Sequence, residues 1–238
     1  MLDDMTFVFV HGGAHGAWCW DRVRPHLDRP SVAVDLPGRG SRPSPLESVT
    51  LQDFEDAVIE EVEAQGEGPV ILVGHSLAGI TLPRVAERIP DRLAHLVFIA
   101  CTVPDEGVAV LNDLSPDVEL LASQNLEHPV AMTLPDEIAR SMFCNDMDEE
   151  QTRFVLSHLS AEAWQPMQTP SRLAGLRQGL PATYLKLLRD QSVPPELQDK
   201  MIANVGQPRV IEMDAGHNAM VSQPEALARI LNEIASTA

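Results

Sequence analysis

A serine stands where the sequence changes from one structural pattern to another. The run Val70–Gly74 is apolar and β-branched, whereas the residues from Leu77 to Ile89 have helical spacing. A sharp turn from a buried strand into a helix lifts the side chain on the turn clear of the sheet, and the helix N-terminus points N–H groups toward it. Ser76, which lies on this turn, is therefore a candidate nucleophile for acyl transfer.

This turn requires small residues two positions before and two positions after the serine. Gly74 meets the first requirement, and Ala78, followed by Gly79, stands where the common form of the motif has glycine. Alanine is small enough for the bend, so we interpret the segment as a tolerated variant of the nucleophile elbow. The strand before it and the helix after it favour this interpretation over a chance match in a loop.

A serine needs a base to take its proton, and His217 is the candidate. It follows the strand-like run Arg209–Met213 and precedes a helical pattern that begins at Pro224. Parallel strands end at one edge of a sheet, so this position brings His217 to the edge where Ser76 lies. The other histidines are expected in the first loop, beside the nucleophile, or in helices, loops and the cap: His11, His15, His26, His75, His95, His128 and His158.

An acid must hold the base in one tautomer, and three aspartates compete for this role. Asp190 follows a predicted strand, and the chain order Ser76, Asp190, His217 is a known order for such a triad. Asp105 follows the preceding predicted strand, where some triads have their acid. Asp214 is expected to be too close to His217 in sequence to reach the far ring nitrogen. We therefore predict Asp190 as the acid.

Acyl transfer also needs N–H groups that meet the negative charge on the carbonyl oxygen. One donor is expected from the backbone of Leu77, directly after the serine, and the second from the loop after the first strand. Gly13 is our choice in that loop, because a glycine allows close approach of the backbone. A plain glycine turn is the alternative interpretation.

Six short apolar runs bounded by turn residues predict strands that are buried on both faces. They are Thr6–Val10, Ser31–Leu36, Val70–Val73, Leu96–Ala100, Thr183–Leu188 and Arg209–Met213. Helical patterns alternate with them at Leu51–Ala64, Leu77–Ile89 and Pro224–Ile234. This alternation predicts an α/β architecture with a parallel sheet and right-handed crossovers.

The alternation stops between about Thr102 and Pro170. Helical pieces at Pro135–Phe143 and Glu149–Leu159, without a convincing strand, predict a helical cap inserted at 103–170 into a core formed by 1–102 and 171–238. Such a cap is expected to line the substrate pocket. Expected substrate contacts are Gly12, His75 and Trp164, although simple packing within the cap is an equal alternative for Trp164.

The amino-acid composition limits the kinds of partner that the protein is expected to bind. The net charge of −18 repels phosphate backbones and anionic membrane surfaces, so nucleic acid and membranes are not expected, and a strongly anionic substrate is disfavoured. The acidic N-terminus and its short apolar run favour a cytoplasmic protein. The three cysteines have no metal-site or disulfide spacing, and no metal, dinucleotide or other cofactor is expected. The sequence leaves a homodimer open.

Several segments resemble the plant methyl-esterase and hydroxynitrile-lyase family and its bacterial esterase relatives. The opening motif is the specific one, and the segments together cover nearly the whole chain. They are HGGAHGAWCW (11–20), DLPGRG (35–40), GHSL (74–77), FCND (143–146), TP (169–170), Asp190 through PELQ (195–198), and GH (216–217).

This resemblance implies an α/β-hydrolase fold, with a mostly parallel central sheet, flanking helices and an inserted helical cap. It also implies a triad of Ser76, Asp190 and His217, and two chemistries on one scaffold. Cyanogenic lyases of the family have threonine, an acidic residue and lysine where this chain has Gly12, His75 and Asn218. We therefore expect a carboxylic-ester hydrolase that acts on a small apolar or aromatic ester.

Other functions remain open at this point. A hydroxynitrile-lyase-like or other carbon–carbon lyase would use the same serine and histidine to move protons without an acyl-enzyme. A cofactor-free oxygenase is a further alternative on the same scaffold. A receptor that binds a small molecule without turnover is a third, and the intact set of serine, aspartate and histidine argues against it.

Overall fold

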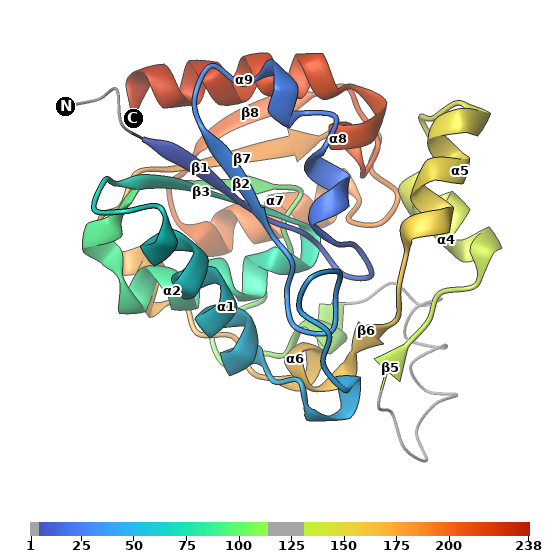
Figure 1. Cartoon of the computed structure of the whole chain (residues 1–238), viewed down its shortest axis with the longest axis horizontal. Coiled ribbons are helices and arrows are strands. Elements are labelled where there is room, and N and C mark those ends of the chain that lie inside the picture. The colour runs from blue at the N-terminus through green and yellow to red at the C-terminus, as the bar shows by residue number, and fades with distance from the viewer. Residues whose placement is uncertain (1–4, 114–130) are drawn as a thin grey trace.

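The computed structural model describes residues 5–113 and 131–238. Its centre is a six-stranded sheet in the order β2-β1-β3-β4-β7-β8, in which every neighbouring pair is parallel (Figure 1). The prediction of a mostly parallel sheet is confirmed. The strands are β1 (Thr6–Val10), β2 (Ser31–Val34), β3 (Val70–His75), β4 (Leu93–Ile99), β7 (Ala182–Leu187) and β8 (Arg209–Met213).

Side chains alternate between the two faces of the sheet, because successive residues of a strand point in opposite directions. Along β1, Val8 and Val10 belong to one hydrophobic cluster, and Phe7 and Phe9 belong to the other. All four side chains are fully buried. Helices therefore cover both faces, which is why the strands of the sequence read as continuous apolar runs rather than alternating ones.

Helices from separate parts of the chain cover each face. The cluster that contains Val8 includes residues of α1 (Leu51–Ala64), α2 (Leu82–Arg88) and α7 (Pro195–Val205). The cluster that contains Phe7 includes residues of α9 (Pro224–Thr237), and in Figure 1 this helix lies on the side of the sheet opposite α1 and α2. The short elements are α8 (Ala219–Ser222) and the 3-10 turns η2 (Ala17–Trp20), η3 (Arg24–His26), η4 (Leu46–Ser48), η5 (Ser76–Ile80), η6 (Pro90–Arg92), η7 (Val110–Asp113) and η8 (Ala174–Arg177).

The helix predicted over Leu77–Ile89 is divided in the structure. The 3-10 turn η5 begins at the serine itself, and α2 begins at Leu82 with Pro83 in its first turn. Proline has no N–H to continue the hydrogen-bond ladder of a preceding helix, so the chain starts a new helix there. The division keeps Ser76 on a tight turn rather than inside a regular helix.

The segment 103–170 contains helices and one small pair of strands. The predicted helices are present as α4 (Asp136–Phe143) and α5 (Glu149–His158), and α6 (Trp164–Gln168) follows them. The expectation that no strand occurs here is wrong, because β5 (Ala131–Met132) and β6 (Glu162–Ala163) form an antiparallel pair. Strands of two residues leave no periodic pattern in a sequence.

In Figure 1, α4 and α5 stand beside one end of the central sheet. Residues 1–4 of the predicted core, and 114–130 of the predicted cap together with His128, lie outside the described residues. Among the residues that the structure describes, no helix has both the length and the apolar character needed to cross a membrane.

Candidate active site

The nucleophile elbow forms where β3 ends. Ser76 has a φ of +53°, a left-handed backbone conformation that few residues other than glycine adopt. A Cβ atom at Gly74 would lie 3.1 Å from the Cβ of Ala78 and 2.7 Å from Leu82 Cδ1, so a larger residue would push these side chains aside. The left-handed conformation of Ser76 costs about 1–3 kcal/mol, and it persists where the surrounding structure enforces it. The elbow is thus built by close packing of small residues around a strained serine.

Three side chains predicted from the sequence meet in a hydrogen-bonded chain. The Nε2 atom of His217 lies 3.0 Å from Ser76 Oγ, and its Nδ1 atom lies 2.7 Å from Asp190 Oδ2. The side chains of His217 and Asp190 have no exposed surface. They follow β8 and β7, and the serine follows β3, so all three stand at the carboxyl edge of the sheet.

The surroundings of Asp190 fix the tautomer of the histidine. Its Oδ1 atom accepts hydrogen bonds from the backbone N–H groups of Ser192 and Val193, at 2.8 and 2.9 Å. The carboxylate therefore acts as an acceptor on both oxygens, and His217 must donate from Nδ1. The lone pair of Nε2 then faces the hydroxyl of Ser76, as a base requires.

The two competing aspartates lie elsewhere. Asp105 is 53% exposed and forms an ion pair with Lys200 at 3.4 Å. Asp214 is 77% exposed and forms an ion pair with Arg189 at 2.8 Å. The carboxylate that contacts His217 is that of Asp190.

Gly12 and His75 pack directly against this chain of side chains. A Cβ atom at Gly12 would lie 2.7 Å from the Cβ of Ser76 and 3.0 Å from His75 Nδ1, so a larger residue would displace Ser76. His75 donates from Nε2 to the carbonyl oxygen of His217 at 2.9 Å. The sequence predicts both residues as substrate contacts, whereas the structure gives the ring of His75 no exposed surface and a place behind the base.

Trp164 lies in the hydrophobic core. It is the first residue of α6, is 4% exposed, and belongs to the same cluster as Val8 and the residues of α1. This environment agrees with the packing alternative for Trp164. A substrate contact for this residue stays a prediction.

Gly13 lies against the side chain of Leu77, the residue that carries the other predicted oxyanion donor. A Cβ atom at Gly13 would be 3.3 Å from Leu77 Cδ2, and among the described residues neither backbone N–H group has an acceptor. The loop around Gly13 is held by bonds on both sides. His15 donates from Nδ1 to the Gly13 carbonyl at 2.7 Å, and the N–H of Ala14 donates to Glu162 Oε2 at 2.9 Å.

A buried ion pair also supports the loop around Gly13, and the sequence analysis did not predict it. Arg39 and Glu162 approach to 2.7 Å, and each side chain is 2% exposed. Arg39 also donates from Nε to the carbonyl oxygen of His15 at 3.1 Å, and Glu162 accepts from the N–H of Ala163 at 2.9 Å. The pair thus joins the loop after β1 to β6 in the segment predicted as the cap.

Replacing Arg39 with methionine is expected to destabilise the protein by about 3–5 kcal/mol, because it leaves the carboxylate of Glu162 buried and without its counter-charge. Arg42→Met is the matched control. Arg42 forms a pair of the same 2.7 Å length with Glu60, but these side chains are 32% and 65% exposed, so a loss of at most about 1 kcal/mol is expected. Urea unfolding measures both values, and equal losses would contradict the role of burial.

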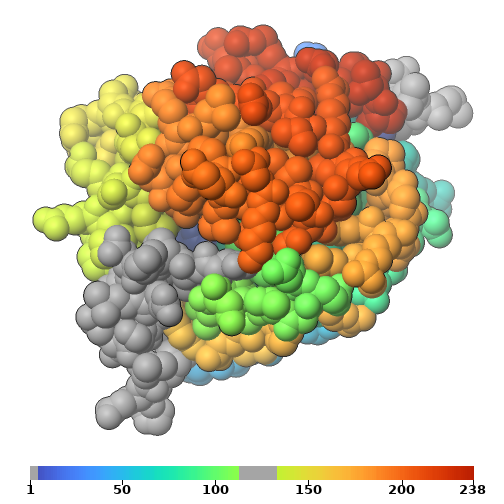
Figure 2. Space-filling view, turned by 180° about the vertical axis from the view of Figure 1, so that it is seen from behind, coloured from blue at the N-terminus to red at the C-terminus, as the bar shows by residue number. Residues whose placement is uncertain are grey.

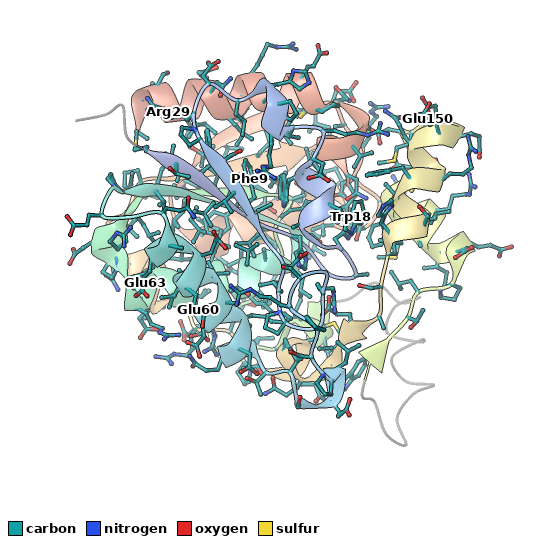
Figure 3. The ribbon with its side chains drawn as sticks, in the orientation of Figure 1. Phe9, Trp18, Arg29, Glu60, Glu63 and Glu150 are labelled. Atoms are coloured by element: carbon teal, nitrogen blue, oxygen red, sulfur yellow. The ribbon has the colours of Figure 1, made fainter. Side chains whose placement is uncertain are left out.

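Phe143 covers His217 from the side of α4. Its ring is 4% exposed and stacks on the ring of His217, with centroids 5.4 Å apart and planes at 22°. The neighbouring helix α5 contacts η2 through Trp18, whose ring lies 5.4 Å from that of Phe154 (Figure 3). The sequence analysis assigned no role to Phe143, since a phenylalanine in an amphipathic helix reads as ordinary core.

Three histidines near the site are buried as neutral rings. Burial lowers the pKa of His11 to about 4 and that of His15 to about 3, and it holds the pKa of His75 well below its usual range. Their bonds agree with neutral tautomers: His11 donates from Nδ1 to the Gly12 carbonyl at 2.8 Å and accepts at Nε2 from the N–H of Leu36 at 3.2 Å.

Acid is therefore expected to unfold the protein from pH 6.5 downward. Below that pH the unfolded chain binds protons at these histidines and the folded chain does not, so stability falls as pH falls. His11 and His15 should each account for a loss of about 2 kcal/mol between pH 7.5 and pH 5. Urea midpoints across this range measure the loss; His11→Asn should reduce the slope, and the exposed His26→Gln should not. An equal effect of both variants would contradict the assignment.

Comparisons with known proteins agree with this architecture. Residues 7–230 match the model of the Alpha/beta hydrolase family. Methylesterase 7 of Arabidopsis thaliana is 31% identical, over 96% of this chain and 95% of that protein. Polyneuridine aldehyde esterase of Rauvolfia serpentina is 29% identical, over 97% and 96%.

Solved structures share the fold. An extracellular alpha/beta-hydrolase from a Paenibacillus species superimposes with a TM-score of 0.86 at 24% identity, covering 96% of this chain and 98% of that one. A pyrethroid hydrolase from Sphingobium faniae has a TM-score of 0.77 at 23% identity, covering 98% and 97%. With its parallel sheet, its elbow and these matches along nearly its whole length, the chain belongs to the alpha/beta hydrolase family and, within it, to the plant methylesterase group.

Proposed function

We propose that the protein is a serine carboxylic-ester hydrolase with Ser76 as nucleophile, His217 as general base and acid, and Asp190 as the acid of the triad. The observation that carries this proposal is the continuous chain of hydrogen bonds from Ser76 Oγ through His217 to Asp190, at 3.0 and 2.7 Å. The names of the relatives, methylesterase 7 and polyneuridine aldehyde esterase, support the same chemistry.

In the first half of the reaction, His217 Nε2 takes the proton of Ser76 as Oγ attacks the acyl carbon of the ester. Negative charge develops on the carbonyl oxygen, where the N–H groups of Gly13 and Leu77 stabilise it. Asp190 stabilises the imidazolium that forms. His217 then returns its proton to the leaving alcohol, and an ester between the acyl group and Ser76 remains.

The second half repeats these steps with water. His217 takes a proton from a water molecule, and the resulting hydroxide attacks the acyl carbon. The oxyanion forms in the same place, and the proton passes from His217 to Ser76 Oγ as the bond to the acyl group breaks. The products are a carboxylic acid and the free enzyme.

The substrate that fits this site best is a small apolar or aromatic ester. Phe143 presents an aromatic ring beside His217, and the net charge of −18 disfavours anionic substrates. Residues 103–170 would form the cap over this site. The contacts of the turn between α4 and α5 with the loops that carry Asp190 and His217, and of β6 with the loop after β1, support a cap that is docked on the core.

Lyase chemistry fits these residues less well. The cyanogenic lyases of the family carry threonine where Gly12 stands, and here any Cβ atom would lie 2.7 Å from the Cβ of Ser76. They carry lysine where Asn218 stands, and Asn218 is fully buried and neutral. The chain therefore lacks the cation that would stabilise a departing cyanide at this position.

The proposal is tested with two substrates on the purified protein. Hydrolysis of p-nitrophenyl acetate, without release of cyanide from mandelonitrile, is the expected result. Cyanide release without ester hydrolysis would support the lyase instead. Saturable binding of a small molecule with no product from either substrate would support a receptor and contradict the esterase.

A further inference from the structure

The turn that joins α4 to α5 lies against the two loops that carry Asp190 and His217. It spans Cys144–Met147 and is closed by a hydrogen bond from the N–H of Met147 to the Cys144 carbonyl at 3.2 Å. In Figure 2 the yellow-green surface of α4 and α5 abuts the orange surface of the segment that follows β7. The two central residues of the turn, Asn145 and Asp146, have no part in the mechanism described above.

Asn145 bonds to the backbone directly before the acid of the triad. Its Nδ2 atom donates to the carbonyl oxygen of Arg189 at 2.7 Å, and Arg189 immediately precedes Asp190. The backbone of the same residue is also held by the loop after β8, since the N–H of Arg189 donates to the carbonyl oxygen of Ala215 at 2.9 Å. A shift of Asn145 would therefore move the backbone that carries the carboxylate.

Asp146 bonds to the backbone directly before the base. Its Oδ2 atom accepts from the N–H of Gly216 at 2.7 Å and from the hydroxyl of Ser222 at 2.9 Å. The side chain is 1% exposed, and the guanidinium of Arg189 lies 3.7 Å away as its counter-charge. A buried carboxylate with these partners has a fixed position, and it transmits that position to His217.

The turn leaves no space for a side chain at Gly216. A Cβ atom there would lie 2.6 Å from Asn145 Oδ1 and 2.6 Å from Asp146 Oδ1. The backbone before His217 therefore touches both side chains of the turn. Because Asn145 and Asp146 are adjacent in the chain, one turn contacts both loops, which are also bonded to each other through the Arg189 N–H and the Ala215 carbonyl.

We propose that Asn145 and Asp146 are positioning residues that hold Asp190 and His217 in hydrogen-bonded register. This inference rests on the proposed function for its catalytic consequence. The stack of Phe143 on His217 comes from the end of the same helix and fixes the plane of the ring. The contacts of Asn145, Asp146 and Phe143 thus align the acid with the base.

Two variants test this role. Asn145→Asp replaces the donating amide with a carboxylate that cannot donate to the Arg189 carbonyl, and Asp146→Ala removes the acceptor of the Gly216 N–H. Glu149→Gln is the matched control, because the side chain of Glu149 lies in the same region, is 74% exposed and pairs with the surface residue Arg140. We measure kcat/KM for p-nitrophenyl acetate and the downfield proton NMR resonance of His217 Nδ1–H. The resonance is assigned to this proton by its absence from the spectrum of Asp190→Asn.

Both variants are expected to lower kcat/KM by about 10- to 100-fold and to shift or broaden the resonance, because small misplacements of catalytic groups have effects of this size. The control should match the wild type in both measurements. An unchanged resonance and unchanged kcat/KM in the folded variants would overturn the proposal. If Asp146→Ala does not fold, Asn145→Asp decides alone, since Asn145 is exposed and the change is isosteric.

The two proposals can fail separately. A wild-type protein that does not hydrolyse the ester would contradict the proposed function. The resonance of His217 would still report whether the turn holds the histidine against the carboxylate, because that signal does not depend on turnover.

Discussion

Ser76→Ala is expected to lower kcat for p-nitrophenyl acetate by about 10⁴- to 10⁶-fold, because it removes the atom that forms the acyl-enzyme. The Oγ atom is the one that lies 3.0 Å from His217 Nε2, and alanine offers nothing in its place. Residual activity should come from the oxyanion donors and from substrate binding alone. Initial rates with matched protein concentrations, together with a thermal unfolding curve for each protein, measure the effect.

Ser236→Ala is the matched control for this experiment. Its hydroxyl is exposed and bonds to the carbonyl oxygen of Glu233 within α9, far in sequence from the elbow. Its rate should equal that of the wild type. If Ser76→Ala retained most of the activity while remaining folded, the hydrolysis would come from another group, and the assignment of the nucleophile would be wrong.

Asp190→Asn is expected to lower kcat by about 10⁴-fold through the tautomer of the histidine. The amide oxygen should stay with the N–H groups of Ser192 and Val193, which require an acceptor. The amide NH₂ then faces His217 Nδ1, which must become an acceptor, and the ring proton moves to Nε2. A protonated Nε2 cannot take the proton of Ser76.

The two other aspartates provide the controls. Asp105→Asn and Asp214→Asn change exposed carboxylates that pair with Lys200 and Arg189, so their rates should stay close to that of the wild type. A large loss in Asp105→Asn with little loss in Asp190→Asn would place the acid after β4 instead. Rates for the three variants under one set of conditions decide between these aspartates.

The central strands of the sheet were readable from the sequence because they are buried on both faces, whereas the edge strand β8 is mostly exposed. Runs such as Thr6–Val10 and Arg209–Met213 are bounded by turn residues, and both coincide with observed strands. Helix α7 (Pro195–Val205) was not predicted, although Leu197, Met201 and Val205 follow each other at a spacing of four residues. Pro194 and Pro195 at its start and the charged residues within it masked that signal.

The candidate catalytic residues could be predicted from the sequence for a related reason. Ser76, Asp190 and His217 each follow a predicted strand, and parallel strands deliver such residues to one edge. The supporting contacts had no comparable signal. Arg39 meets Glu162, and Asp146 meets Gly216, only after the chain has folded, and neither pair has a spacing that a sequence pattern could detect.

The most direct test of the central claim is the covalent modification of Ser76 by diethyl p-nitrophenyl phosphate. An activated serine should attack the phosphorus, form a stable bond to it and release p-nitrophenol. Mass spectrometry of the intact protein should then show one diethylphosphoryl group per chain, located on the peptide that contains Ser76 and absent from Ser76→Ala. A protein that stays unmodified, or that carries the group on another residue, would contradict a nucleophilic Ser76.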